Sequence, residues 1–433
     1  MNRRWIFPLG SAVALGLIGF STAYKPATQG PQKVAIADRF AIPVVLPLTG
    51  SGSFLGRAEQ EALQRFEAQA RAGRIPGAMP VKFSFFDDQS SPQVAVQLVN
   101  QIMPSNPSVI LGSALVGMCK AMAPLVKDGP VLYCLSPGIH PEPGSRVFTS
   151  SSSTKDLMAA TLAYFRARGL TRIGLITSID ATGQDARRSL PDLIKDSKLT
   201  GLTLVDNVFF NPGDISASAQ IEHLKARGPD AIVVWSTGAA VGIVLKGLVQ
   251  AGLDVPVATT DGNMTLAQMK QYSAILPDEL LIPSPAWMMT NDPAHPAVVK
   301  ARRELQAAYP ATQRPDFAAV LAWDPALVVA SALRPGMTAD VLNRKLETLS
   351  DFPGTSGTYD MNVTPQRGLD LQSVVVNRWN PATNYWEPVS GPGGTLQTPA
   401  GQTSDRRSTT GQPVNGPSAN GQPANGQAGN RHA

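Results

Sequence analysis

Four short patterns in this 433-residue chain combine residue types that could do chemistry. The first is a glycine-rich turn at Gly50, Gly52 and Gly56, with Asp87 further along the chain. In dinucleotide-binding proteins such glycines let the pyrophosphate approach the backbone, and an acid about 20 residues later binds the ribose. Here Gly52 and Gly56 are one residue further apart than the dinucleotide-binding pattern requires. Asp87 also lies well beyond the expected distance of about 20 residues. A GxxxxGK[ST] phosphate loop is also absent from the sequence.

The other three patterns also fit structural roles better than catalytic ones. Ser152 to Lys155 reads S-x-x-K, but the SDN and KTG motifs that accompany a serine nucleophile are missing, so a helix cap is the better interpretation. Asp87 and Asp88 are adjacent at a strand end and point apart, which favours a turn. Paired metal-ligand spacing is absent among the four histidines, which are His140, His223, His295 and His432. We therefore predict no catalysis, no metal and no cofactor.

The composition limits the class of protein. The length suits two or three domains, and a hydrophobic content of 43% is enough for full cores. The net charge is +5, but Lys and Arg are scattered along the chain. Nucleic-acid binding needs a clustered basic face, so we do not expect it.

The N-terminus predicts export. Arg3 and Arg4 precede a short apolar stretch from Trp5 to Phe20, and Ser21-Thr22-Ala23 supplies small residues for cleavage. The alternative is an uncleaved membrane anchor, but glycines and a proline interrupt the stretch, which is short for a span of about 20 residues. We interpret residues 1–23 as a signal peptide and 24–39 as a polar lead. The mature protein is then periplasmic.

The pattern of elements that would position these residues is alternating strand and helix. Apolar strands are predicted at 42–46, 81–86, 108–111 and 131–135, with amphipathic helices between them. After a serine run the alternation restarts, with strands at 172–177, 202–209, 231–235 and 256–259. Such alternation indicates parallel sheets with right-handed crossovers. We predict an α/β fold of two Rossmann-like lobes joined by several strands, with a ligand between them.

The predicted lobes use discontinuous parts of the chain. From residue 280 prolines mark a connection, and helices at 297–309, 317–333 and 338–350 return to the first lobe. A hairpin-like region and a late strand at 372–379 follow. Lobe 1 is then 40–149 plus 286–358, and lobe 2 is 150–285 plus 359–390. Residues 391–433 are rich in Gly, Pro, Gln and Asn, and we expect them to be disordered.

The chain contains two cysteines, Cys119 and Cys134. In the predicted fold, one opens a helix and the other ends the next strand, so both lie at one edge of the sheet. Export permits a disulfide between them, and two buried thiols are the alternative.

The order of motifs resembles the type I periplasmic solute-binding proteins of the branched-chain amino-acid (Leu/Ile/Val) class, which serve ABC importers. The resemblance runs from about Ile42 to Trp379. It is carried by PLTGSGSFLG, FFDDQSSPQVAVQLVNQI, VLYCLSPG, VFTSSSSTKDLMAATLAYF and DISASAQIEHLKARGPDAIVV, in that order. It implies the type I periplasmic binding fold, a small-molecule solute, an ABC permease as partner and a monomer.

The resemblance also implies a cleft site. In lobe 1, Phe54 and Leu55 correspond to an apolar cap. Leu115 and Val116 stand where the family often has Ser or Thr for a ligand carboxylate, and Gly138, Ile139 and His140 stand where it often has small residues and a Thr. In lobe 2 the corresponding residues are Thr182, Thr237, Asp261 as an acid for an ammonium group, and Trp287 as a stacking ring.

These residues depart from the amino-acid-binding pattern. Leu115 and Val116 offer no side-chain donor, and a buried carboxylate without donors is costly. We therefore expect an altered solute, such as an amide, an aromatic or another small organic molecule. The alternative function is a degenerate scaffold of the same fold, acting as an envelope sensor or a protein–protein interaction module.

Overall fold

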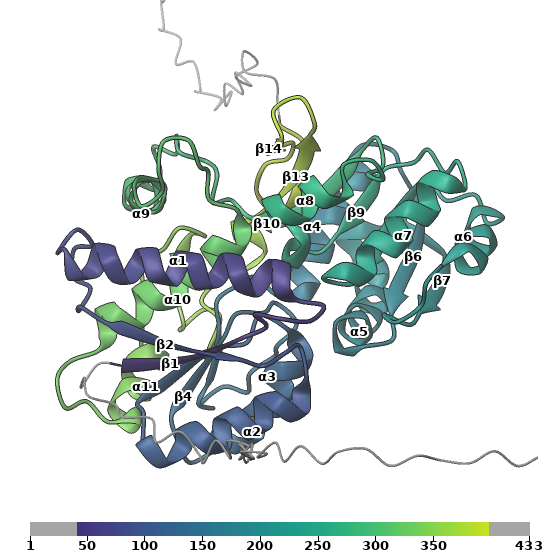
Figure 1. Ribbon diagram of the computed structural model, residues 1–433. Helices are drawn as coiled ribbons and strands as arrows, with labels where there is room; N and C mark the ends of the chain where they lie inside the picture. The colour runs from purple at the N-terminus through teal and green to yellow at the C-terminus, as the bar shows by residue number, and fades with distance from the viewer. Residues whose placement is uncertain (1–40, 398–433) are drawn as a thin grey trace, which may run out of the picture.

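Two α/β lobes, each built on one sheet, lie side by side in the computed structural model (Figure 1), which describes residues 41–397. The predicted signal peptide, the whole polar lead and residues 398–433 of the predicted tail lie outside the described residues. Within residues 41–397, no helix combines the length and the apolar character needed to span a membrane.

Lobe 1 is built on sheet A, whose strands are all parallel. Its order is β2-β1-β3-β4-β5, with β1 Ala41–Leu46, β2 Lys82–Asp87, β3 Val109–Gly112, β4 Val131–Cys134 and β5 Val147–Thr149. Val44 and Leu46 share one core with Phe66, whereas Val45 faces the other core. This alternation places helices on both faces, namely α1 Ser53–Arg71 and α10 Phe317–Ala332 on one and α2 Pro92–Ile102 and α3 Val116–Met122 on the other.

Lobe 2 is built on the seven-stranded sheet B, in the order β14-β13-β10-β9-β8-β6-β7. Its parallel strands are β6 Arg172–Ser178, β7 Thr203–Phe210, β8 Ala231–Trp235, β9 Val257–Thr259 and β10 Leu280–Pro285. The last two, β13 Val374–Asn380 and β14 Tyr385–Pro388, are antiparallel, so the sheet is mixed rather than purely parallel as predicted. Its helices are α4 Thr154–Ala167, α5 Ala181–Lys195, α6 Ser218–Lys225, α7 Ala239–Gln250 and α8 Leu266–Tyr272.

Sequence reasoning missed β10, which lies inside sheet B although Pro283 and Pro285 suggested a connection. The pairing of β10 with β9 stops at Leu281. Beyond that residue only β13 pairs with β10, so one side of the strand carries no ladder bonds that a proline could break. The short helix α8 and the strand β14 were missed as well.

After β10 the chain returns to lobe 1. Helix α9 Pro296–Ala307 precedes α10, which packs along α1, and α11 Ala339–Glu347 lies beside α10 and β4. A two-stranded hairpin follows, of β11 Phe352–Pro353 and β12 Thr358–Tyr359. Residues 359–368 also belong to lobe 1, because Gln366 accepts a hydrogen bond from the Thr149 amide of β5. The second crossing into lobe 2 therefore lies after Gly368, later than the predicted boundary at 358.

The first residues of the predicted disordered tail are ordered. Ser390 and Leu396 form a β-bridge, and the turn between them packs on α4. Gly394 has φ +78°, and a Cβ there would lie 1.9 Å from the Ala160 carbonyl oxygen. The high glycine content of this segment suggested disorder. At Gly394, however, the absence of a side chain allows the backbone to lie against α4.

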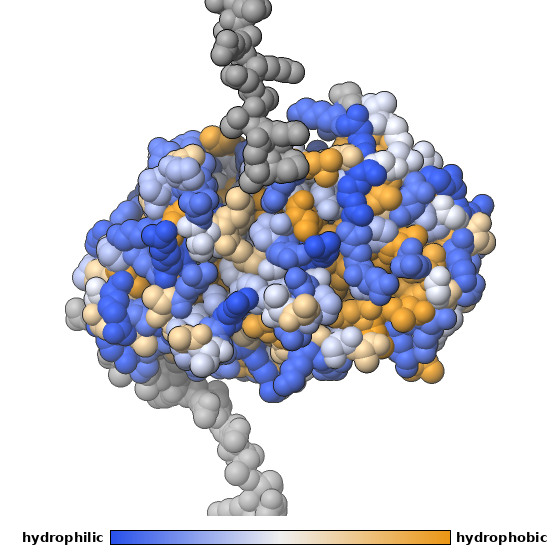
Figure 2. Space-filling view, turned by 90° about the horizontal axis from the view of Figure 1, so that it is seen from above, coloured by the Kyte–Doolittle hydropathy of each residue, from blue (hydrophilic) through white to orange (hydrophobic). Residues whose placement is uncertain are grey.

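The surface differs in character between the lobes. Figure 2 shows apolar side chains gathered over the lobe 2 side of its upper face, whereas the lobe 1 side is mainly polar. The exposed large apolar residues of lobe 2 include Ile179, Phe209, Ile215 and Val249.

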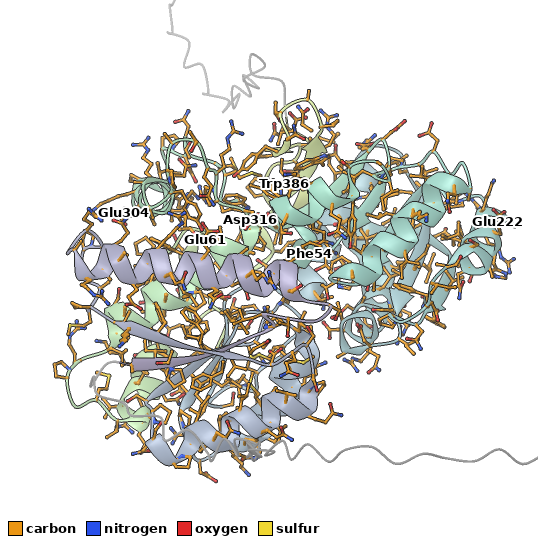
Figure 3. All side chains as sticks on the ribbon, in the orientation of Figure 1. Phe54, Glu61, Glu222, Glu304, Asp316 and Trp386 are labelled. Carbon is orange, nitrogen blue, oxygen red and sulfur yellow. A yellow bond between two sulfur atoms is a disulfide. The ribbon has the colours of Figure 1, made fainter. Side chains whose placement is uncertain are left out.

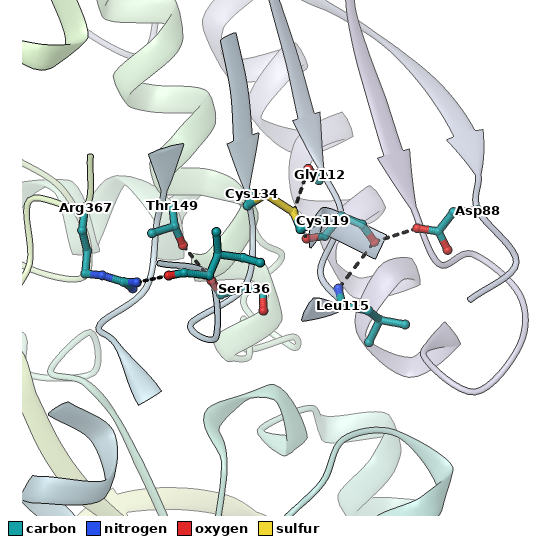
Figure 4. Close-up of a disulfide and its surroundings, with 10 residues drawn as sticks. Asp88, Gly112, Leu115, Cys119, Cys134, Ser136, Thr149 and Arg367 are labelled. Atoms are coloured by element: carbon teal, nitrogen blue, oxygen red, sulfur yellow. Dashed lines mark hydrogen bonds between the residues drawn. A yellow bond between two sulfur atoms is a disulfide. The ribbon is translucent and has the colours of Figure 1, made fainter. Parts of the chain in front are cut away.

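Cys119 and Cys134 form a disulfide that joins α3 to the end of β4 (Figure 4). Both residues are buried in the core on the α2–α3 face of sheet A. The bond fixes α3 next to the loop that follows β4, and residues of both segments line the space between the lobes.

Removing this disulfide should destabilise the protein. The bond joins residues 15 apart, and cross-linking a loop of that size contributes about 3 kcal/mol by restricting the unfolded chain. The C119S/C134S double variant should lower the unfolding free energy by about that amount in urea melts. Wild type treated with dithiothreitol should melt like the double variant. Two thiols that alkylate without reductant in the unfolded wild type would contradict the bond.

Candidate ligand-binding cleft

The carboxyl ends of the parallel strands of both sheets face one another between the lobes. This arrangement places the loops after β1, β3 and β4 opposite those after β6, β8 and β9. The residues that line the space are Leu55, Ala114, Val116, Leu135, Ser136, Pro137, Gly138, Thr154, Thr182, Trp235, Thr237, Thr260, Gly262 and Leu321. They enclose a cavity of about 10 Å³, room for about one water molecule. The lobes are therefore closed on each other.

Backbone contact between the lobes accounts for this tight closure. Gly238, in the loop after β8, has φ +71°, and a Cβ on it would lie 2.2 Å from the carbonyl oxygen of Ser51. The amide of Ala239 donates to the same oxygen over 3.3 Å. The glycine-rich loop of lobe 1 thus contacts the start of α7 in lobe 2. Gly238 of lobe 2, rather than the glycines of the lobe 1 loop, permits this close approach, because a side chain on it would collide with Ser51.

The lining of the cleft is neutral. Within the part of the chain that the structure describes, no charged side chain borders the cavity. Hydroxyl groups come from both lobes, and Leu55, Trp235 and Leu321 supply apolar surface. Such a site can hydrogen-bond a polar group of a solute and bury an apolar body, but it offers no ion pair.

Five of the predicted site residues line this cavity, namely Leu55, Val116, Gly138, Thr182 and Thr237. The structure also adds residues that sequence reasoning missed, and Trp235, Thr260 and Leu321 are the clearest examples. Trp235 is the last residue of β8, and Thr260 directly follows β9. Both positions can be recognised from the sequence. Leu321 lies on α10, and only the packing of α10 against α1 brings it to the cleft.

Three predicted apolar contacts lie elsewhere. Phe54 points away from the cavity and packs edge-on against Tyr272 of α8, with ring centroids 6.3 Å apart. Leu115 packs against Gly52. Trp287 is buried against Phe317 and Tyr385, so it belongs to the core beside β10 rather than to the cleft.

Ile139 and His140 lie behind the cleft loop rather than in it. The carbonyl of Ile139 accepts a hydrogen bond from Arg367. His140 reaches lobe 2, where its Nε2 lies 2.7 Å from Oδ1 of Asp185 on α5. Burial alone would raise the pKa of Asp185, but the hydrogen bond from His140 and the nearby Lys120 outweigh burial and hold that pKa below its usual value. This pair therefore bridges the lobes.

Asp261 is buried behind the cleft, so the prediction that it faces a ligand ammonium is not supported by its contacts. Its two oxygens accept hydrogen bonds from the hydroxyls of Ser151 at 2.8 Å and Thr260 at 2.9 Å. Burial raises the pKa of Asp261 to about 6, although these hydrogen bonds and Arg367 favour its charged form. Its acceptors are engaged by the protein itself.

The fold and this cleft define a two-lobed binding protein whose ligand space lies between the lobes. The chain belongs to the family described as periplasmic binding protein, whose model matches residues 10–379. A curated relative, the Leu/Ile/Val-binding protein homolog 3 of Brucella melitensis, is 25% identical over 243 residues. That match covers 54% of this chain and 64% of the relative, so it spans less than two thirds of the relative's length.

Solved structures share the fold at low identity. An extracellular ligand-binding receptor from Rhodopseudomonas palustris superposes with a TM-score of 0.70 at 19% identity, covering 81% of this chain and 99% of the receptor. LivJ of Streptococcus pneumoniae, solved with isoleucine, gives 0.66 at 19% identity, covering 80% and 97%. An R. palustris solute-binding protein solved with benzoate gives 0.66 at 18%, covering 83% and 97%. These likenesses confirm the predicted type I periplasmic binding fold.

The buried carboxyl of Asp261 should make stability depend on pH. Between pH 3.8 and about 6 the unfolded chain loses this proton while the folded protein keeps it, so the unfolding free energy falls as pH rises. Asp261→Asn abolishes this contribution. Relative to wild type, its unfolding free energy should therefore increase by up to about 3 kcal/mol between pH 3.5 and pH 7. Urea melts across this range measure the difference, and a pH-independent difference would contradict the assignment.

The pair of His140 and Asp185 should favour the closed form. Half of the His140 side chain is exposed, so His140→Ala should shift the balance toward open lobes by at most about 1 kcal/mol. Small-angle X-ray scattering would detect this shift as a larger radius of gyration. Arg188→Ala is the matched control, because Arg188 contacts the same carboxylate from within lobe 2. An equal expansion in both variants would show that the bridge between the lobes is not responsible.

Proposed function

We propose that the protein is exported to the periplasm, binds a small organic solute between its lobes and delivers it to an ABC importer. The single observation that carries the solute class is the neutral cleft, lined by hydroxyl and apolar groups. We propose a mainly apolar solute, aromatic or aliphatic, with one amide, hydroxyl or carboxyl group. The family supports a binding role rather than an enzymatic one.

The cleft fits a free α-amino acid poorly. An ammonium group taken out of water needs an acidic partner, and Asp261, next to the cleft wall in the loop after β9, already accepts from two hydroxyls. A single carboxylate is less demanding, because hydroxyl and backbone N–H donors can satisfy it. The relatives solved with isoleucine and with benzoate illustrate both kinds of ligand in this fold.

A second candidate function is a scaffold that no longer binds solute and instead contacts other envelope proteins. The specific observation in its favour is the filled cleft, with about 10 Å³ of free space and direct contact between Gly238 and Ser51. In this proposal the closed lobes are the working form. The exposed apolar residues of lobe 2 would then be available for a partner protein.

Thermal shift with three matched compounds tests the solute class. We expect benzamide or benzoate to raise the melting temperature, because each has an apolar body and one polar group, and we expect isoleucine to have no effect. Thr182→Val and Thr237→Val should each weaken binding about fivefold, the effect of losing one hydroxyl hydrogen bond. Thr348→Val, outside the cleft at the end of α11, is the control.

Ligand retained by the purified protein, identified by mass spectrometry after denaturation, extends the test beyond these compounds. A shift with isoleucine alone would contradict the neutral-solute argument. The absence of both retained ligand and any shift across a broad panel of small solutes would favour the scaffold.

A further inference from the structure

A second cavity, much larger than the cleft, lies between α1, α8 and the segment that leads into α10. Its volume is about 620 Å³, within the range of about 300–1,000 Å³ that is typical of small-molecule sites. Phe54, which the resemblance assigned to the cleft, lines this cavity instead. Figure 3 shows Phe54, Glu61 and Asp316 around the same stretch of α1. We call it the α1–α8 pocket.

The acids of the α1–α8 pocket are already engaged. Oε1 of Glu61 lies 2.7 Å from Nη2 of Arg65. The same oxygen accepts a hydrogen bond from the side-chain amide of Gln313, at 2.9 Å. Asp316 accepts from the backbone amide of Leu266 at 3.0 Å and caps the start of α10. Burial raises the pKa of Asp316 to about 6, so this carboxyl is neutral only in mildly acidic solution and stays mainly ionised at pH 7.

The cations of the pocket are not neutralised. Arg57 donates through Nε to the carbonyl of Leu48, at 3.0 Å. The guanidinium of Arg314 lies over the ring of Tyr385, 4.7 Å from its centroid. Across residues 41–397 neither arginine has a carboxylate within ion-pair distance. Both side chains therefore have N–H groups left to bind an anion.

Phe54, Ala58, Leu266 and Tyr309 add apolar surface to the wall. A ligand that uses both parts must combine an anionic group with an aromatic or aliphatic body. We propose that the α1–α8 pocket binds a small organic anion of this kind, a carboxylate, sulfonate or phosphate, at a site separate from the cleft. Arg57 and Arg314 bind its anionic group.

The pocket also couples to lobe closure, because its walls come from both lobes. Helix α1 belongs to lobe 1 and α8 to lobe 2, and the hydrogen bond from Leu266 to Asp316 already joins the two sides. The two arginines belong to lobe 1 and Leu266 to lobe 2, so a ligand that contacts all three binds better when the lobes are in this arrangement. By linkage it favours the closed form, as a solute in the cleft would.

The fluorescent anion 1-anilinonaphthalene-8-sulfonate is a suitable probe, because it carries one sulfonate on an aromatic body. Titrated into the full chain, it should give saturable binding at one site. Arg57→Gln and Arg314→Gln should each weaken that binding about tenfold, the effect of losing a charge-assisted hydrogen bond. Arg344→Gln, an exposed arginine of α11 outside the pocket, should leave it unchanged.

A second variant separates the pocket from general loss of folding. Ala267 lies exposed at the edge of the pocket, so Ala267→Trp should block the probe while leaving the melting temperature close to that of wild type. Thr182→Val, in the cleft, should bind the probe normally, which keeps this test independent of the proposed solute. Probe binding that persists both in the Arg57→Gln/Arg314→Gln double variant and in Ala267→Trp would overturn the proposal. So would the absence of saturable binding to wild type up to about 1 mM probe.

Discussion

The rest of the structure depends on one buried cation, the guanidinium of Arg367. It forms no ion pair within the described residues, and it donates instead to the carbonyl oxygens of Pro137, Ile139 and Ser151. Burial lowers its pKa to about 10, so it stays charged at neutral pH. Because removing one partner of a buried charge is costly, these carbonyls are held in place. Arg367 thereby ties the last part of lobe 1 to the cleft loop and to the first crossing between the lobes.

The same cation explains why the cleft itself can be neutral. Ser151 gives its carbonyl to Arg367 and its hydroxyl to Asp261, so one hinge residue connects the buried cation with the buried acid of lobe 2. The charges that might serve a zwitterionic ligand are thus used to hold the hinge and the lobe edges. What remains at the cleft surface is hydroxyl groups, backbone and apolar side chains. The sequence alone could not distinguish an Asp that faces a ligand from one that faces Ser151, since both follow a strand of sheet B.

The predictable part of the molecule is the part that local pattern determines. Alternating apolar strands and capped helices such as Ser91-Pro92 at α2 fix the two-lobed α/β fold, and each of these signals is visible in a few consecutive residues. The cleft was predicted less well because its residues are brought together by packing. Phe54 turns to Tyr272, Trp287 fills the core beside Phe317, and Leu321 arrives from a helix far along the chain. β10 was missed because its prolines lie where one side of the strand has no partner.

The closed arrangement sets a condition on any solute. With room for about one water molecule, the cleft can be entered only when the lobes separate, so apparent affinity falls with the fraction of open protein. Among the contacts that close the lobes, the half-exposed His140 pair and the edge-on contact of Phe54 with Tyr272 are each worth only about 1 kcal/mol. A solute must replace them with its own contacts to both walls. Because those walls offer hydroxyl groups and apolar surface, the gain comes mainly from burying an apolar body, and a strongly hydrated zwitterion has least to gain.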